Sequence, residues 1–252
     1  MPKGFDKATS TLKKLRLLMR IGGLEKQGKT HFALTAPGAV GVLDNDRGIE
    51  GVVEKFADEK DIYVKSFREM PMKTPEDYTA RWNAFDDYYH RLLSDVAVRS
   101  IVWDTDTETW EMARLAYFGR PSNIPLKYPP LNALYRKLID EAYDADKNLI
   151  LISRYKKQYV RKSPTSDDSA WNGKYEAAGF GELKDIVQVN LRARIAVDGN
   201  GNNTPSIEVV NCRQNMAMNG KVFDDVDDPF YAPTFPCVAA NIIEGNTPED
   251  WE

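Results

Sequence analysis

Apolar runs alternate with amphipathic segments along this chain, and the alternation predicts its fold class. The apolar runs are short, continuous and bounded by turn residues or polar segments: residues 16–22, 39–44, 96–104 and 148–153. Such runs are typical of strands in a parallel sheet that is covered on both faces. Helical spacing or helix boundary signals mark the segments between them: residues 29–36, 75–95, 105–119 and 131–147. Strands alternating with helices predict an α/β fold with a mostly parallel central sheet flanked by helices.

Two segments of the C-terminal half modify this picture. Residues 154–181 are polar and contain three glycines, which predicts a long loop, and a loop of that length in a compact domain is usually functional or disordered. Residues 188–197 and 205–213 flank a turn-rich stretch and predict a C-terminal antiparallel hairpin that extends the sheet. A ligand is expected at the carboxyl edge of the parallel strands.

Composition limits the class of protein. The 252 residues suit one domain over residues 16–240, preceded by an arm (1–15) and followed by an acidic tail (241–252). Two cysteines and two histidines give no zinc cluster and no disulfide framework. We expect a cytoplasmic protein with no membrane partner, because the sequence lacks a signal region and an apolar stretch of the ~20 residues that a membrane span needs.

The charge is unevenly distributed. The whole chain carries a formal net charge of −4, yet residues 216–252 hold eight acids against Lys221 alone, which leaves +3 on the remainder. A basic body beside an acidic end is compatible with a nucleic-acid partner, and a solvated acidic end that favours solubility is the alternative.

The first apolar run leads into a glycine-rich loop with the pattern Gly23-x-x-x-x-Gly28-Lys29-Thr30. This is the phosphate-loop spacing: backbone N–H groups surround the phosphates, the lysine reaches the β- and γ-phosphates, and the threonine hydroxyl binds Mg²⁺. The predicted nucleotide-binding residues are Gly23, Leu24, Glu25, Lys26, Gln27, Gly28, Lys29, Thr30 and His31.

Carboxylates that end the next apolar runs are candidates for the remaining chemistry. Asp104 ends the stretch "SIVWD" and is the candidate Walker B acid that holds the metal with Thr30, the alternative being an Asp that caps the following helix. Asp44 and Asp46 follow the second run, and we assign to Asp46 the polarisation of the attacking water. The alternative for this pair is a turn.

Together these features resemble the RecA-type ATPase core over roughly residues 16–215. The resemblance rests on motif order: phosphate loop, acidic pair, Walker B strand ending Asp-Thr, a fourth strand leading into a basic segment, and a final hairpin. More narrowly, the compact size and the stretch "GKYEAAGFGELKDIVQVNL" resemble phage RecA-like ATPases grouped with single-strand annealing proteins. The resemblance implies a RecA-like P-loop NTPase core that uses ATP and Mg²⁺.

The resemblance also implies individual roles, with departures. It supports catalytic roles for Lys29, Asp104 and Asp46, although Asp46 stands where RecA proteins place a glutamate. Arg213, at the end of the hairpin, would act on the nucleotide of a neighbouring subunit. The sensor glutamine of that family is replaced by Ser153-Arg154, so coupling of DNA binding to hydrolysis is expected to differ.

RecA proteins bind DNA after the fourth strand, where this chain has cations and tyrosines without an acid. Cations neutralise phosphates, and aromatic rings stack on bases without sequence preference. The alternative is an exposed extension of the strand that carries lysines and arginines. The predicted DNA-binding residues are Arg154, Tyr155, Lys156, Lys157, Tyr159, Arg161 and Lys162, with Trp171 and Tyr175 farther along.

The N-terminal arm contains "GFDKATS", which resembles the Phe-x-x-Ala polymerisation motif of eukaryotic RecA-type recombinases. Phe5 and Ala8 would fill pockets on an adjacent subunit, and a disordered basic terminus is the alternative. The sequence therefore predicts a homo-oligomeric ATPase that binds single-stranded DNA, assists phage-type annealing or recombination, and meets recombination or replication proteins in the bacterial host cytoplasm. The alternatives are a nucleotide or small-molecule kinase and a nucleotide-gated accessory module with little hydrolysis.

Overall fold

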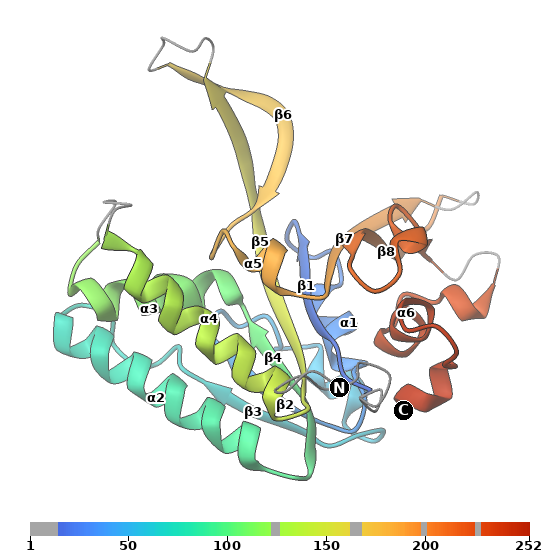
Figure 1. Ribbon diagram of the computed structural model, residues 1–252, viewed down its shortest axis with the longest axis horizontal. Helices are drawn as coiled ribbons and strands as arrows, with labels where there is room; N and C mark the ends of the chain where they lie inside the picture. Colours follow the sequence, from blue (N-terminus) through green and yellow to red (C-terminus); the bar gives the residue numbers. More distant parts are fainter. Residues whose placement is uncertain (1–14, 122–126, 162–167, 198–200, 225–227) are drawn as a thin grey trace, which may run out of the picture.

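One sheet with a parallel centre organises the chain (Figure 1). The computed structural model describes residues 15–121, 127–161, 168–197, 201–224 and 228–252. Its strands are β1 (Leu18–Gly23), β2 (Ala39–Asp44), β3 (Ile62–Ser66), β4 (Val98–Asp104), β5 (Asn148–Arg161), β6 (Ser169–Ala177), β7 (Val189–Val197), β8 (Asn203–Cys212) and β9 (Val222–Phe223). The order is β3-β2-β4-β5-β1-β7-β8-β9, parallel from β3 to β7 and antiparallel from β7 to β9, and β6 pairs with β5. The predicted α/β class, the mostly parallel sheet and the antiparallel C-terminal strands are confirmed.

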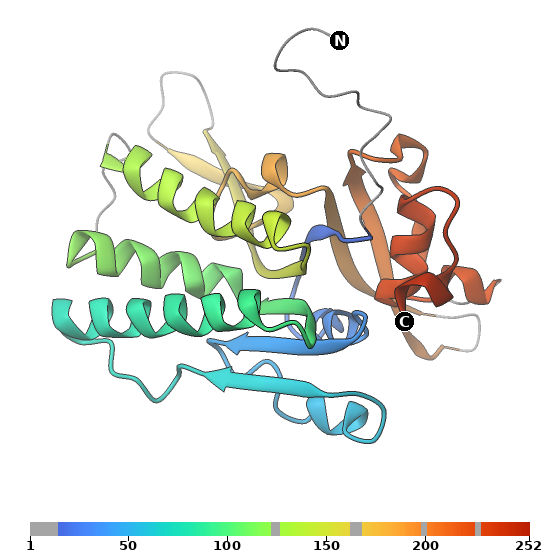
Figure 2. The ribbon, with the colours of Figure 1, turned by 60° about the horizontal axis from the view of Figure 1, so that its bottom comes forward.

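Helices cover both faces of this sheet. They are α1 (Lys29–Leu34), α2 (Pro75–Ser94), α3 (Asp106–Phe118), α4 (Pro129–Asp144), α5 (Leu183–Ile186) and α6 (Phe235–Ile242), with 3-10 turns η2 (Val53–Phe56), η4 (Met216–Met218), η5 (Pro229–Tyr231) and η6 (Pro248–Trp251). Figure 2 shows α2, α3 and α4 stacked as one layer, with α6 on the far side of the sheet. Each layer encloses its own buried apolar cluster.

The two clusters explain why the strands are continuous apolar runs. In β5, Leu149 and Leu151 belong to the cluster under α2, α3 and α4, whereas Ile150 and Ile152 belong to the cluster under α1 and α6. Successive side chains of a strand point to opposite faces, so a sheet that is covered on both faces buries all four.

The predicted boundaries of α3 are confirmed. Thr105 is the N-cap, because its hydroxyl accepts a hydrogen bond from the backbone N–H of Glu108 at 3.3 Å. Gly119 ends the helix in the left-handed conformation with φ 67°, where glycine is favoured.

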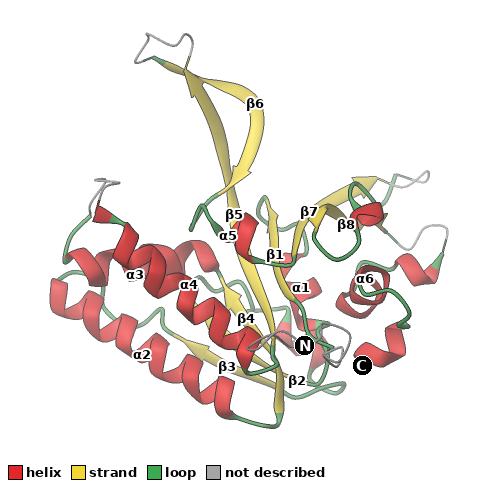
Figure 3. Ribbon diagram, viewed as in Figure 1, coloured by secondary structure: helices red, strands yellow, loops and turns green. Residues whose placement is uncertain are grey.

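The expected loop over residues 154–181 is wrong. β5 continues to Arg161 and pairs with β6, so the segment rises from the body as a two-stranded antiparallel hairpin (Figure 3). The alternative interpretation of the basic segment that begins at Arg154, an extension of the fourth strand, is confirmed for its secondary structure. The sequence missed this because a polar two-stranded ribbon lacks the apolar alternation that marks a half-buried strand.

The acidic C-terminal segment is joined to the body through an apolar side chain. Trp251 is fully buried and its ring lies 5.8 Å from that of Phe235 in α6. Among the helices of the described residues, none combines the length and apolar character that crossing a membrane requires. Phe5 and Ala8 lie outside the described residues.

We predict that Trp251→Ala lowers the free energy of unfolding by about 3–5 kcal/mol, the usual cost of truncating a large buried aromatic side chain. Urea unfolding followed by far-UV circular dichroism measures this. The control is Trp171→Ala, because Trp171 is exposed on the hairpin. Equal midpoints for the two variants would show that the C-terminal segment contributes nothing to the core.

Candidate nucleotide site

The glycine-rich loop joins β1 to α1 in the conformation that its sequence predicts. Gly28 has φ 80°, a left-handed conformation that glycine adopts without strain. Lys29 folds back into the loop, where its Nζ donates hydrogen bonds to the carbonyl oxygens of Gly23 (3.2 Å) and Leu24 (2.6 Å). Burial lowers the pKa of Lys29, and the carboxylates of Asp104 and Asp46 oppose that shift. The Lys29 ammonium is thus held by two backbone carbonyl oxygens of the loop.

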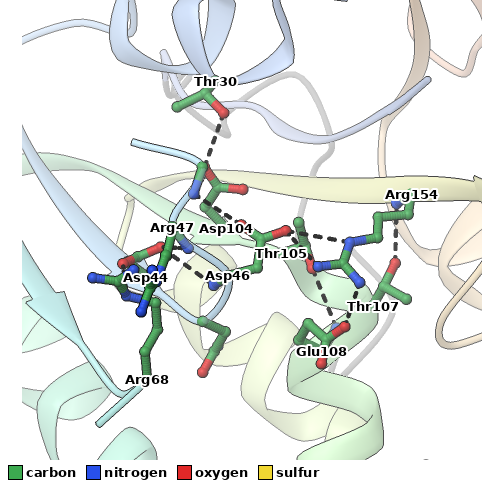
Figure 4. Close-up of polar contacts among 12 residues, drawn as sticks. Thr30, Asp44, Asp46, Arg47, Arg68, Asp104, Thr105, Thr107, Glu108 and Arg154 are labelled. Atoms are coloured by element: carbon green, nitrogen blue, oxygen red, sulfur yellow. Dashed lines mark hydrogen bonds and ion pairs between the residues drawn. The ribbon is translucent and has the colours of Figure 1, made fainter. Parts of the chain in front are cut away.

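Asp104 at the end of β4 contacts this loop directly. The Thr30 hydroxyl donates a hydrogen bond to Asp104 Oδ2 at 2.9 Å (Figure 4). Thr105, not Asp104, caps α3, so the helix-cap alternative for Asp104 is not what the structure has. Gly48 lies against the same carboxylate, and a Cβ on Gly48 would come within 2.5 Å of Asp104 Oδ2.

The surroundings of Asp104 disfavour its ionised form. Burial, together with the nearby Asp46 carboxylate, raises the pKa of Asp104 to about 7, while the hydrogen bond from Thr30 acts in the opposite direction. A divalent cation beside the carboxylate would favour ionisation. Mg²⁺ takes oxygen ligands and is commonly held by one or two carboxylates, water and substrate phosphates. Thr30 and Asp104 offer that donor set, although no group of three or more His, Cys, Asp or Glu side chains forms a metal site within the described residues.

The acidic pair at the end of β2 has two different settings, because Asp44 is buried in the turn whereas Asp46 borders the cavity beside the loop and also accepts a turn hydrogen bond from the Gly48 N–H at 3.0 Å. Asp44 accepts hydrogen bonds from the backbone N–H groups of Arg47 (3.0 Å) and Asp46 (3.3 Å), and its other oxygen lies 3.5 Å from Arg68 Nε. It therefore holds the turn, as the turn interpretation expects. Asp46 lines the same cavity as Lys29.

Arg154 is the main unexpected component of the site. Its guanidinium donates to Asp46 Oδ2 at 2.8 Å and to Glu108 Oε1 at 2.5 Å (Figure 4), and its backbone N–H donates to Thr107 Oγ1 at 3.0 Å. The sequence analysis groups Arg154 with the DNA-binding residues, but the structure places Arg154 in the lining of the candidate nucleotide cavity. The signal that could have placed it was its position at the carboxyl end of the fourth apolar run, the edge where the loop and both acids also lie.

A cavity of about 640 Å³ is lined by most of the residues predicted to bind the nucleotide. Its lining includes Glu25, Lys26, Gln27, Gly28, Lys29, Thr30, His31, Asp46, Asp104, Thr105 and Arg154. Leu24 instead lines a neighbouring cavity. Arg213 directly follows β8. The last residue of β8 pairs with Val189 at the start of β7, and Val189 pairs with Met19 near the start of β1. The Arg213 guanidinium donates a hydrogen bond to the carbonyl oxygen of Asp185 at 2.6 Å. It therefore lies at the opposite edge of the sheet from the phosphate loop.

A buried polar network that the sequence analysis missed lies at Ser153, the residue before Arg154. Ser153 Oγ accepts from Arg20 Nε at 2.8 Å and donates to Asp106 Oδ2 at 3.3 Å, and Tyr135 donates to Asp106 Oδ1 at 2.7 Å. Burial raises the pKa of Asp106 to about 6, and Arg20 opposes that shift. Every member has a partner, so the network fixes the end of β5.

The remaining predicted residues lie along the β5–β6 hairpin. Tyr155 lies against Gly22 in the strand that leads into the phosphate loop, where a Cβ on Gly22 would come within 2.3 Å of the Tyr155 ring. Lys156, Lys157, Tyr159 and Arg161 are exposed farther out. Lys162 lies outside the described residues.

No protein-family model matches this sequence, and no curated protein is significantly similar to it. The function is therefore inferred from the chemistry of the residues that the fold brings together.

We predict that Asp104→Asn stabilises the metal-free protein at pH 8. Because the folded-state pKa of Asp104, about 7, exceeds its ordinary 3.8, the folded protein binds the proton more tightly, and stability falls as the pH rises through that interval. Asparagine carries no charge, so the variant's gain in melting temperature should be present at pH 8 and absent near pH 4. Thermal melts in chelator measure it, with the exposed Asp58→Asn as control. A gain of equal size at both pH values would contradict this explanation.

Proposed function

We propose that this chain is a RecA-like, Mg²⁺-dependent ATPase that binds single-stranded DNA and assists annealing or recombination of the phage type as a homo-oligomer. The observation that carries the proposal is the 2.9 Å contact between Thr30 of the phosphate loop and Asp104, two groups 74 residues apart in the chain. A phosphate loop with a carboxylate beside its threonine hydroxyl is the arrangement that binds a nucleoside triphosphate with Mg²⁺.

Nucleotide binding would replace hydrogen bonds that the phosphate loop makes to itself. Lys29 would leave the carbonyl oxygens of Gly23 and Leu24 for the β- and γ-phosphates, and the loop N–H groups would bind the remaining phosphate oxygens. Thr30 and Asp104 would hold Mg²⁺, which neutralises charge on the phosphates when bound. The burial of Asp104 suits a carboxylate whose partner is a cation.

Asp46 and Arg154 are the groups available for hydrolysis. In the proposal Asp46 would polarise an attacking water, and in the chain without ligand it is paired with Arg154. A γ-phosphate in the cavity would compete with Asp46 for the guanidinium of Arg154. If the guanidinium moved to the phosphate, the Asp46 carboxylate would be free to act as a base. Arg154 belongs to the strand that continues into the hairpin. A movement of the hairpin would therefore shift Arg154 beside the nucleotide.

The oligomeric part of the proposal rests on the resemblance to RecA-type ATPases, which assigns Arg213 a role across a subunit interface. The position of Arg213 at the opposite sheet edge prevents it from reaching the nucleotide of its own chain, so a role on the nucleotide requires a neighbouring subunit. Contacts of Phe5 and Ala8 with such a neighbour remain predictions.

We predict that the protein hydrolyses ATP in the presence of Mg²⁺, that single-stranded oligothymidylate stimulates hydrolysis, and that Lys29→Ala lowers kcat about 10²-fold or more. The lysine ammonium stabilises charge that develops on the transferred phosphoryl group, and removing one such group typically has that effect. Steady-state phosphate release measures it. The control is Lys184→Ala, which removes an exposed lysine far along the chain from the loop. Unchanged hydrolysis in Lys29→Ala would contradict a catalytic role for the phosphate loop.

We also predict that Arg154→Ala lowers kcat by about 10²-fold while changing the KM for ATP far less, because the guanidinium would act mainly on charge that develops in the transition state. Arg154→Lys keeps the charge but not the planar fork that bridges Asp46 and Glu108. It should recover only part of the rate. A larger change in KM than in kcat would identify Arg154 as a ground-state binding residue.

One observation favours a second candidate, a nucleotide-gated accessory module with little hydrolysis. The candidate base Asp46 is neutralised by Arg154, and a chain that kept this pair with ATP bound would bind nucleotide without turnover. Tight ATP binding to a chain with no measurable phosphate release, with or without DNA, would support the module. Phosphate transfer to nucleoside monophosphates without a response to DNA would instead identify a kinase.

A further inference from the structure

The β5–β6 hairpin has two chemically different faces. We define the aromatic face as Tyr155, Lys157, Tyr159, Trp171 and Tyr175. Cross-strand register pairs Lys157 with Tyr175 and Tyr159 with Trp171, so these side chains share one side of the ribbon. The Trp171 and Tyr175 rings lie 5.9 Å apart, and Lys157 Nζ lies 5.0 Å from the centre of the Trp171 ring.

The opposite face is neutral and internally paired. Lys156 lies directly across from Glu176 with 3.3 Å between Nζ and Oε1. Gln158 accepts a hydrogen bond from Asn172 Nδ2 at 2.6 Å. This face therefore has a satisfied ion pair and amides, whereas the aromatic face has four rings and one cation, Lys157, without an acid.

A groove of about 630 Å³ lies at the foot of the aromatic face. Tyr155, Lys174 and Tyr175 line it from the hairpin, and Arg192 and Arg194 line it from β7. The two arginines are two residues apart in a strand, so they point to the same side of the sheet. Each is ion-paired to Glu208, a single acid, so the groove keeps an excess of positive charge.

The exposure of the rings indicates what this surface binds. Tyr159 is 59% and Trp171 45% exposed, although burial of large aromatic side chains is strongly favourable. Exposed rings beside cations suit unstacked bases joined by phosphates. Bases inside a duplex present no free faces to such rings, so the chemistry matches a single strand.

We propose that single-stranded DNA lies along the aromatic face and enters the groove, with bases stacked on Trp171, Tyr159 and Tyr175 and phosphates paired with Lys157, Arg192 and Arg194. The proposal rests on the proposed function for the class of ligand and deepens it by assigning the surface. It adds the β7 arginines to the DNA-binding residues and removes Lys156 from them. It also places the strand beside Leu24 and Gln27 of the phosphate loop, which line the same groove.

Equilibrium binding of a fluorescein-labelled oligothymidylate, followed by anisotropy over a range of salt concentrations, tests the proposal on the full-length protein. Trp171→Ala should weaken binding about 5- to 150-fold with an unchanged salt slope, because it removes stacking and no charge. Trp171→Phe should recover most of the affinity. Arg194→Gln should make the slope of log K against log salt shallower by about 0.7, the change expected for one lost phosphate contact to a single strand.

Lys156→Ala is the matched control, since it removes a cation one residue from Lys157 on the opposite face. We expect its affinity to stay within about twofold of the unsubstituted protein. The assignment is overturned if Lys156→Ala weakens binding as much as Trp171→Ala, or if Trp171→Ala and Arg194→Gln bind normally. In either case, DNA binding by the unsubstituted protein would leave the proposed function intact. Absence of binding by the unsubstituted protein at low salt would overturn both.

Discussion

The site depends on the parallel register of three neighbouring strands, in which β1 and β4 end beside the middle of the longer β5. β5 lies between β1 and β4, and the register aligns Gly23 with Arg154 on one side and Asp104 with Ile152 on the other. The phosphate loop, Arg154 and Asp104 therefore emerge side by side from the sheet edge, and the Thr30 hydroxyl can bridge to Asp104 across the end of β5. Parallel strands deliver their carboxyl ends to one edge, which is why open α/β sheets bind ligands there.

The strands beside the site also bury two charged side chains, and the network around Ser153 offsets the unfavourable free energy of that burial. Arg20 and Asp106 are both buried, and burying two charges is unfavourable unless each finds close partners. Ser153 contacts both of them, and Tyr135 supplies a further hydrogen bond to Asp106. Because the members come from β1, β5 and two helices, a change at one of them would shift the end of β5 on which Arg154 stands. The network thus fixes geometry at the site without touching a ligand.

Short-range signals were sufficient for much of the fold and for half of the site. The loop glycines, the cap at Thr105 and the turn held by Asp44 are set by contacts within a few residues, so the sequence predicts them. Arg154 was misplaced because its partners Asp46 and Glu108 are distant in sequence and meet only through the strand order. Arg192 and Arg194 were missed for a related reason: alternating polar residues in β7 signal an exposed face, but only tertiary structure shows that the hairpin stands over that face. Likewise, the acidic charge of the C-terminal segment concealed that Trp251 anchors it.

The period of a β-strand explains how one segment can serve two sites. Ser153, Arg154 and Tyr155 are consecutive, and their side chains alternate between the faces of β5. Arg154 is directed to Asp46 and the nucleotide cavity, while Tyr155 lies against Gly22 and accepts a hydrogen bond from Arg192 at 3.1 Å on the groove side. A displacement of the hairpin that moves Tyr155 must also move Arg154, because no flexible residue separates them. In the proposed ATPase, a strand of DNA in the groove and a triphosphate in the cavity would therefore act on neighbouring positions of the same strand. This arrangement would allow coupling without the sensor glutamine of the RecA-type core, because the guanidinium of Arg154 would respond to the charge on a nucleotide while its backbone belongs to the hairpin that we propose binds DNA.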